Sequence, residues 1–531
     1  MKGIKKKNYF YTLLILILIL LSFLFGYKYS LYNQDFHHWS YITAQFFEFQ
    51  NNQRLYKDIF LQYGAGQIFF FTLLNFFYKI DIVTIGFTFN LIYALNFLII
   101  YKIFQFITSK KISTIITIVI FLLHPFSLLP WPDYLSGFFL NLFIYFFLKL
   151  NSEKKIPIIL AILLFASTFF RQSYIISIVL AVVVFLLLNL VFARKIIFKK
   201  IFISFFFFIL IFLIGLFYFE NLELHTMQFT KSVENFANTT NALEIKEKIL
   251  EKYGYNLWIL FRLIYFFLRF FINLFNIYSI DNIIFIISIT IVLILFYNFS
   301  KKIYLQDIFL KKIIFITLIG LTGLIQSLYN FETFRIINSS IGIFVGALYC
   351  INLKIMDYNN TKVKKNLNFF FLTFFITTLT FSFFNNLIKK KILGIDNDLY
   401  YSLDDNVFFG KKKIKKESFS YYSEIAEVIC KADSFTINNS QDFAISYLCK
   451  DKKNSIPFYL NSKLLFRDDK LNQLKVDSKE VFIITHDQLI DQTDYMLNKK
   501  ILINHENWNG PKTLYIYKRV IQKKSIDYNY F

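Results

Sequence analysis

Apolar runs of about twenty residues recur from residue 8 to residue 387, and each is long enough to cross about 30 Å of hydrocarbon. Hydrophobic residues make up 56% of the 531-residue chain, which includes 72 Phe. A soluble protein of this length would divide into several domains, but this pattern overrides that expectation. The chain is therefore predicted to be an α-helical polytopic membrane protein.

The orientation of the chain follows from its first residues. Lys2 and Lys5 to Lys7 precede the apolar run 8–27, and no small-residue cleavage site follows that run. We expect an uncleaved anchor rather than a signal peptide. Positive charge places the N-terminus in the cytoplasm, so that the loop 28–63 faces out.

We expect about eleven spans and two interfacial helices. The segment 64–80 is short and begins with Gly-Ala-Gly, and 256–278 carries Arg262 and Arg269 on one face. Both are interpreted as helices at the outer interface, which places every short basic loop in the cytoplasm. The expected spans after the anchor are 82–107, 112–129, 134–150, 156–170, 173–193, 200–219, 281–298, 313–329, 336–353 and 367–387.

The chain changes character at residue 388, where mixed-charge sequence replaces the apolar runs of residues 1–387. The runs FTINN, VFIITH and TLYIYKRV predict strands, so residues 388–531 are expected to form a small α/β domain. The span count places this domain outside, although its lysine clusters 389–391 and 411–416 fit that side poorly. Cys430 and Cys449 can form a disulfide there, and the sequence leaves this pairing open.

Two classes of function are not supported. The net charge is 58 − 35 = +23, but the basic residues lie mostly in short loops beside spans, so no nucleic-acid partner is expected. The sequence contains no phosphate-binding glycine loop of the P-loop or Rossmann type and no Gly-x-Ser-x-Gly motif. A soluble nucleotide-using site is therefore unsupported.

The polar side chains suited to chemistry share one predicted location, the outer ends of spans. A single site built from several loops requires such a shared face, whereas scattered helix-end charges do not. These residues are Asp35, His37, His38, Asp58, Tyr63, Asp133, Arg171, Gln172, Glu332 and Arg335.

Asp35 follows the first span and has two interpretations. In a partly apolar setting, a carboxylate whose pKa is modestly raised can take a proton from an attacking hydroxyl. Asp35 can equally be the N-cap of a following helix. Asp58 is a second catalytic candidate, and its simpler interpretation is a salt bridge with Arg54 or Lys57.

His37 and His38 diverge by about 100° on a helix, so they do not readily share one metal ion. No further His or Cys is spaced to complete a site with Asp35. We expect no cofactor, with a divalent metal as the less favoured alternative. Substrate hydrogen bonding or a structural role is the preferred interpretation of the pair.

Arg171-Gln172 lies at the mouth of a span, where a guanidinium can bind a lipid phosphate through two hydrogen bonds. An arginine that extends from a helix end toward water is the equally favoured alternative. Arg335 has the same two interpretations, with Glu332 as a candidate partner.

These motifs resemble those of the GT-C glycosyltransferases of the protein mannosyltransferase and aminoarabinose transferase type. The similarity is greatest to the bacterial subset with Asp-x-His-His in the first outer loop. It covers residues 8–200 in motif and the remainder in architecture. The matching segments are Asp35-Phe36-His37-His38, Leu55-Tyr56-Lys57-Asp58-Ile59-Phe60, Gln62-Tyr63-Gly64, Pro132-Asp133 and Arg171-Gln172.

The resemblance implies that Asp35 is the catalytic base and that the donor is a polyprenyl-phosphate sugar. Two positions depart from the family pattern. Phe36 stands where many members have an acidic residue, which weakens a metal-dependent or paired-acid mechanism. Ala65 replaces the usual Pro after Tyr-Gly, which alters the start of a helix.

The function expected from these features is inverting sugar transfer at the outer face of a bacterial inner membrane. The acceptor is a hydroxyl of lipopolysaccharide, another glycan, a lipid or a protein, and the expected partners include membrane lipids. Arg171 and Arg335 would stabilise the phosphate leaving group, with Gln172 as a donor, while Asp58, Tyr63, Asp133 and the His pair shape the pocket. A transporter or flippase and a non-catalytic scaffold are the alternatives.

Overall fold

The computed structural model describes residues 2–61, 63–124, 126–150, 158–193, 198–218, 264, 268, 307–327, 333–357, 400–403, 406–431, 434–440, 442–449, 455–457, 480–486, 495–503 and 513–519. Several predicted features lie outside the described residues: the loop 220–255, the interfacial helix 256–278 except residues 264 and 268, the spans 281–298 and 367–387, Glu332 and the lysine cluster 389–391.

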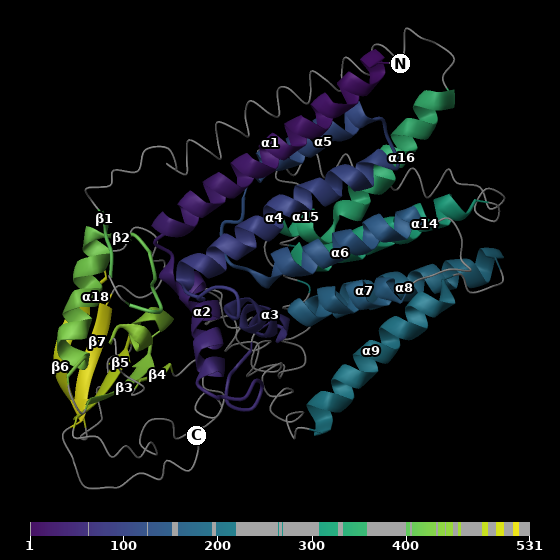
Figure 1. The fold of residues 1–531 in the computed structure, drawn as a ribbon. Coiled ribbons are helices and arrows are strands. Elements are labelled where there is room, and N and C mark those ends of the chain that lie inside the picture. Colours follow the sequence, from purple (N-terminus) through teal and green to yellow (C-terminus); the bar gives the residue numbers. More distant parts are fainter. Residues whose placement is uncertain are drawn as a thin grey trace.

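A bundle of long helices forms the larger part of the structure (Figure 1). A helix occupies each predicted span that falls on described residues. Four helical segments there are long and apolar enough to cross a membrane: Tyr9–Tyr32, Ile82–Gln105, Ser173–Phe192 and Ile308–Ser327. The bundle helices are α1 (Lys2–Tyr32), α4 (Ile82–Gln105), α5 (Lys110–Leu123), α6 (Pro132–Lys149), α7 (Ile159–Phe170), α8 (Ser173–Ala193), α9 (Lys199–Tyr218), α14 (Ile308–Gly323) and α16 (Ile341–Asp357).

Two helix contacts depend on glycine. A Cβ on Gly26 would overlap the Asn90 side chain, whose Nδ2 donates to Gly26 O (3.1 Å) and joins α1 to α4. A Cβ on Gly320 would overlap the backbone of Gly342, where α14 meets α16. Small residues let helix backbones approach closely, and interhelical hydrogen bonds add to packing in a membrane bundle.

The predicted outer loop 28–63 is largely helical, and it contains the helix that the N-cap interpretation of Asp35 predicts. Helix α1 continues to Tyr32, and α2 follows over Phe36–Gln50 with Asp35 as its N-cap. Ile42 and Phe46 of α2 pack into the core of the bundle. The loop is therefore anchored by an apolar helix face rather than held only at its ends.

Helix α3 (Gly66–Asn75) falls inside the predicted interfacial segment 64–80. Its ten residues are too few to cross the hydrocarbon, which takes about twenty. Phe69, Leu73, Phe76 and Phe77 are exposed along it and just after it. An apolar outer face on a short helix fits a position in the membrane interface, which remains a prediction.

The C-terminal domain contains a five-stranded sheet in the order β4-β3-β5-β7-β6. The central strands β3 and β5 are parallel, and β7 pairs antiparallel with both β5 and β6. Strands β3, β5 and β7 confirm the three predicted from FTINN, VFIITH and TLYIYKRV. The strands are β3 (Ser434–Asn439), β4 (Ser455–Pro457), β5 (Glu480–Thr485), β6 (Tyr495–Leu502) and β7 (Thr513–Arg519).

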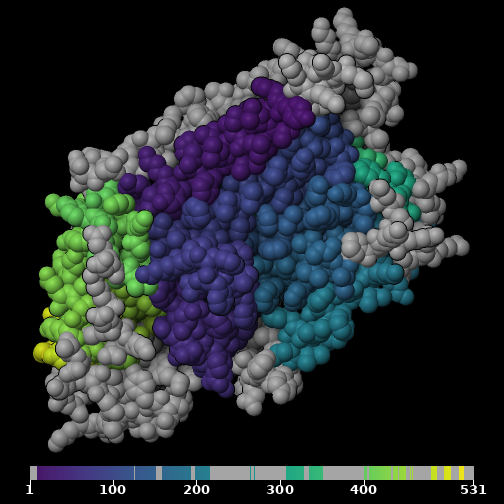
Figure 2. Space-filling model, viewed as in Figure 1, coloured from purple at the N-terminus to yellow at the C-terminus, as the bar shows by residue number. Residues whose placement is uncertain are grey.

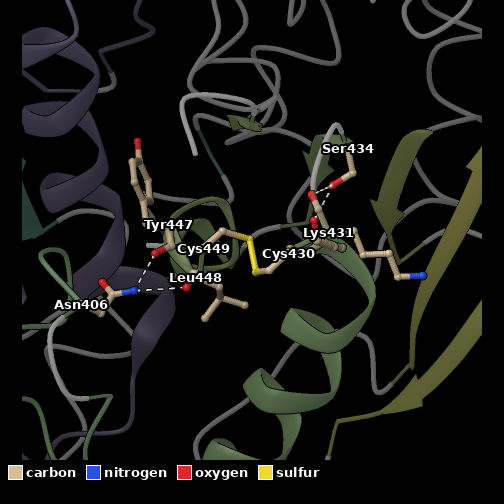
Figure 3. The surroundings of a disulfide bond; sticks show 8 residues. Asn406, Cys430, Lys431, Ser434, Tyr447, Leu448 and Cys449 are labelled. Carbon is tan, nitrogen blue, oxygen red and sulfur yellow. Dashed lines mark hydrogen bonds between the residues drawn. A yellow bond between two sulfur atoms is a disulfide. The ribbon is translucent and has the colours of Figure 1, made fainter. Parts of the chain in front are cut away.

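The domain also contains two short strands, a helix and a 3-10 turn. Strands β1 (Tyr400–Tyr401) and β2 (Ile414–Lys415) pair beside helix α18 (Lys416–Ile429), and a 3-10 turn, η4, covers Phe443–Tyr447. A disulfide joins Cys430, at the end of α18, to Cys449, just after η4 (Figure 3). The pairing that the sequence left open is thus present in the structure.

The C-terminal domain packs directly on the end of the bundle, where the green and yellow surface meets the purple surface in Figure 2. Phe36 and Trp39 of α2 share one hydrophobic cluster with Phe408, Phe409 and Tyr422. One face of α2 therefore contacts the bundle, and another contacts the C-terminal domain.

Candidate functional site

The candidate site begins at the junction of α1 and α2, where Asp35 and His38 are in direct contact. Asp35 Oδ1 accepts from the backbone N of His38 (3.2 Å), and Oδ2 lies 2.7 Å from His38 Nδ1. The predicted N-cap role of Asp35 is confirmed. Both carboxylate oxygens thus contact His38, while both side chains remain partly exposed, 24% for Asp35 and 35% for His38.

The pKa of Asp35 shifts in the direction opposite to the sequence expectation. Burial acts to raise it, but the hydrogen bonds and charge of His38, with a contribution from His37, outweigh burial and lower the pKa below its ordinary value. The expected raised pKa is therefore wrong. Asp35 stays ionised, and in direct contact with His38 it orients the imidazole as a carboxylate partner does.

Aromatic rings connect this pair to the turn between α7 and α8. His38 lies against Trp131, with ring centroids 5.2 Å apart, and Trp131 meets Tyr63 edge to face at 5.1 Å. The Arg171 guanidinium lies over the Tyr63 ring at 5.5 Å. Residues from four separate segments therefore form one continuous series of contacts.

Arg171 forms an ion pair with Asp133. Asp133 is fully buried in the first turn of α6, and the Arg171 side chain is 13% exposed. Arg171 Nε also donates to Ser173 Oγ (3.1 Å) at the start of α8. The structure thus contradicts the alternative of an arginine extended toward water, because this guanidinium is held inward by a buried carboxylate.

Arg335 reaches the same region from α15 (Thr333–Ser339). Its Nη1 donates to Gln326 O (3.1 Å), and the Gln326 side chain accepts from Ser173 Oγ (2.5 Å). Tyr174 lies within electrostatic range of both Arg171 and Arg335. Two guanidiniums therefore approach one short stretch at the start of α8.

Gln172 contacts the loop before α3. Its Nε2 donates to the Tyr56 hydroxyl (3.0 Å), which also accepts from the backbone N of Ala65 (3.2 Å). A Cβ on Gly64 would overlap the carbonyl of Phe169, so glycine permits the loop to touch the end of α7. Gln172 thus holds this loop in place and lies next to Arg171.

Asp58 closes its own loop. Its Oδ2 accepts from Arg54 Nε (3.0 Å) and from the backbone N of Arg54 (2.9 Å). The salt bridge with Arg54, which was the simpler of the two interpretations, is confirmed. Asp58 therefore has a structural role in this loop, and its catalytic role stays a prediction.

His37 faces the C-terminal domain. Its ring stacks on Phe443 of η4 at 6.1 Å, and Tyr41 meets the same phenyl ring at 5.2 Å. The two imidazole rings nevertheless meet edge to face, with centroids 4.8 Å apart, so the predicted divergence of the pair is not what the structure shows. Among the residues that the structure describes, no three His, Cys, Asp or Glu side chains gather as a metal site would require.

Sequence reasoning missed Trp131, Gln326 and Phe443, which contact site residues, and Lys412, on which the charge of Asp35 acts. Trp131 directly precedes the matched Pro132-Asp133, so its position at the helix start was a usable signal. Lys412 gave none, because it belongs to a lysine cluster that resembles solvent-exposed sequence. It is nevertheless fully buried, 4.5 Å from the centroid of the Trp39 ring.

The comparisons with known proteins do not assign the chain to a family. No family model matches the sequence, and no curated protein matches it.

Proposed function

We propose that this protein is an inverting glycosyltransferase that uses a polyprenyl-phosphate sugar. The observation that carries the proposal is the continuous contact from Asp35 and His38 through Trp131 and Tyr63 to Arg171. It joins a proton-accepting pair to a cationic group at one end of an apolar helix bundle. The motifs that resemble the GT-C family lie on the same segments.

In the proposed reaction, an acceptor hydroxyl attacks the anomeric carbon of the donor. A new bond forms from the hydroxyl oxygen to this carbon, and the bond from the carbon to the phosphate oxygen breaks, with inversion. The proton passes to the Asp35–His38 pair, in which the neutral imidazole accepts it. The ionised Asp35 orients this imidazole and stabilises the imidazolium that forms.

The leaving group is a polyprenyl phosphate, which needs charge stabilisation more than it needs a proton. Arg171 is suited to this, because Asp133 and Ser173 fix the plane of its guanidinium. Arg335 supplies a second positive charge beside Tyr174. The acceptor is a cell-envelope glycan, lipid or protein.

The proposed location is the outer face of a bacterial inner membrane. The N-terminal lysines favour a cytoplasmic N-terminus, and the Cys430–Cys449 disulfide favours an oxidising compartment for the C-terminal domain. That domain packs where α1 ends, so both arguments support an outer location of the candidate site. The exposed apolar side chains of α3 would let a long lipid enter from the membrane.

The test is sugar transfer by the purified full-length protein from a polyprenyl-phosphate sugar, with wild type compared with Asp35→Asn. Asparagine preserves the size of the side chain and removes its charge. Asp81→Asn is a matched control, since Asp81 is also a helix N-cap, at the start of α4. We expect Asp35→Asn to lose about 10⁴-fold in rate, as loss of an orienting carboxylate does elsewhere, and Asp81→Asn to remain active.

Equal transfer by Asp35→Asn and wild type would contradict the role of Asp35. Absence of transfer by wild type with every donor tried would contradict the proposed function and favour a transporter or a scaffold.

A further inference from the structure

One segment of the C-terminal domain, residues 406–415, crosses the end of α1, and we call it the strap. Lys412 Nζ donates to the carbonyl of Ser30 (2.7 Å). The backbone N of Lys413 donates to the carbonyl of Leu31 (2.9 Å). Lys412 and Ser30 are 382 residues apart in the sequence.

The strap supplies hydrogen-bond donors to the C-terminal end of α1. The last four carbonyls of an α-helix have no partner within the helix. Near the end of α1, Tyr29 O accepts from the backbone N of Asn33 (2.9 Å), and Tyr32 O accepts from Gln34 Nε2 (2.7 Å). Lys412 and Lys413 supply donors for the two carbonyls between them. The C-terminal domain therefore completes the cap of the helix that precedes Asp35.

Further contacts fix the strap to the bundle. Gln34 Nε2 also donates to Lys413 O (2.9 Å), and Gln34 Oε1 accepts from the backbone N of Lys415 (3.0 Å). At its other end, Phe408 O accepts from the backbone N of Ile82 at the start of α4 (3.0 Å). Gly410 has a φ of +55° and lies against Asp81, where a Cβ would overlap the carboxylate. The strap is thus held on both sides of the Asp35 turn.

Lys412 is the strap residue nearest to the proposed chemistry. Its Nζ lies 4.5 Å from the centroid of the Trp39 ring and 5.7 Å from that of Phe36, so it is enclosed by the first turns of α2. Burial lowers its pKa to about 7, and the negative charge of Asp35 acts in the opposite direction. Lys412 is therefore buried against α2, where the charge of Asp35 acts on it.

We propose that Lys412 is a positioning residue for the Asp35–His38 pair, and that the C-terminal domain is an integral part of the site. Lys412 acts through the end of α1 and through Asp35 and does not itself contact substrate. This inference rests on the proposed function, because its main readout is sugar transfer.

The first experiment compares Lys412→Met with Lys411→Met in full-length protein. Lys411 is the neighbouring lysine of the same cluster, but it is exposed. We expect Lys412→Met to lower kcat on the order of a hundredfold, the effect of a small misplacement of catalytic groups. The donor KM should stay unchanged, because Arg171 and Arg335 are untouched. Equal kcat for the two variants would overturn the proposal.

Lys412→Arg keeps a cation and N–H donors at this position. We expect it to retain more activity than Lys412→Met, and no difference between these two in folded protein would contradict a role for the charge. If Lys412→Met does not fold, Lys412→Gln, which removes the charge, takes its place in the comparison with Lys411→Met, and the expected result is a lower kcat with unchanged donor KM. Equal kcat for that second pair would overturn the proposal.

A second experiment reads the docking of the strap without any sugar transfer. The variant Gln34→Ala removes both strap contacts of the Gln34 side chain and the donor to Tyr32 O. We expect trypsin to cut within residues 411–416 faster in Gln34→Ala than in wild type. Equal cleavage would overturn the docking. An inactive wild type would contradict the proposed function and the positioning role of Lys412, and this digestion would still decide whether the strap is docked.

Discussion

Carboxylates in two regions of the described structure have different kinds of partner. At the end of the bundle, Asp133 is fully buried and forms an ion pair with Arg171. Between α2 and the C-terminal domain, Glu48 accepts from the Tyr447 hydroxyl (2.6 Å), and in η4 Asp442 accepts from the Tyr422 hydroxyl (2.8 Å). The first region pairs a buried acid with a cation, whereas the second pairs acids with phenols.

The difference in partner gives the two regions different charge states. Burial raises the pKa of Glu48 to about 7, although the hydrogen bond from Tyr447 acts to lower it. Burial likewise raises the pKa of Asp442 to about 7, against the hydrogen bond from Tyr422. A phenol supplies one hydrogen bond but no compensating charge, so burial dominates. Opposite charges therefore hold the ion pair at the end of the bundle, whereas the ionisation of Glu48 and Asp442, near the contact of α2 with the C-terminal domain, depends on pH.

Asp133→Ala should have the largest effect on the unfolding free energy, because it leaves the Arg171 guanidinium without its carboxylate. Breaking a buried ion pair by removing one partner costs about 3–5 kcal/mol. Denaturant titration of the purified protein should show this loss. Arg54→Met is the comparison, because Arg54 is 60% exposed and the 7% exposed Asp58 keeps its hydrogen bond from the backbone N of residue 54 (2.9 Å), so the loss should be smaller. Equal losses would mean that burial does not distinguish the two pairs.

Arg171→Lys should have the next largest effect, and it is measured as sugar transfer. Lysine keeps the charge but loses the planar guanidinium that Asp133 and Ser173 orient. We expect kcat to fall by about 10²–10³-fold, the effect of removing one oriented donor to a developing negative charge. Arg171→Lys with wild-type kcat would show that charge alone suffices there.

The stability of the contact between α2 and the C-terminal domain should depend on pH in a direction that the pKa shifts determine. Glu48 has a pKa of about 7 in the folded protein against an ordinary 4.5, so its contribution is complete below about pH 4.5 and is lost as the pH rises through about 7. Asp442 acts in the same direction. Lys412, whose pKa falls from 10.5 to about 7, contributes stability above about pH 10.5 that is lost as the pH falls to about 7.

Glu48→Gln isolates one of these contributions. In wild type, ionisation of Glu48 should lower the unfolding free energy by up to about 3 kcal/mol between pH 4.5 and pH 7. This decrease should be absent in Glu48→Gln. Thermal unfolding at several pH values measures this, with Asp133 variants as the comparison from the other region. A pH profile identical to that of wild type would contradict the assignment of Glu48.

Tyr56→Phe should have the smallest effect. The Tyr56 hydroxyl accepts from Gln172 and from the backbone N of Ala65, which is buried, so the variant leaves donors without a partner. We expect a loss of about 1–2 kcal/mol in unfolding free energy. Tyr9→Phe is a suitable control, because Tyr9 is 74% exposed. A loss no larger than that of the control would show that the Gln172 contact does not hold the loop.

Much of the helical arrangement could be predicted from the sequence. The predicted span 173–193 coincides with α8, and 82–107 agrees with α4 over Ile82–Gln105. Apolar length and local caps suffice for such predictions, since each depends on residues close together in the chain. The N-cap interpretation of Asp35 predicts a helix after it, but the packing of α2 was not predicted, because its faces contact the bundle and the distant C-terminal domain.

The sequence by itself indicated most of the apolar helices, and it brought forward Asp35, His38, Asp133 and Arg171 as candidates. Some bounds were wrong: α5 ends at Leu123, within the predicted span 112–129, and the predicted span 336–353 is divided between α15 and α16. Only the tertiary structure decided their partners: His38 for Asp35, Asp133 for Arg171, and a distant strap for the end of α1. Lys411 and Lys412 show the reason. As neighbours they are equivalent in sequence, but one is exposed and the other is buried beside Asp35, and burial and charge partners are set by segments hundreds of residues away.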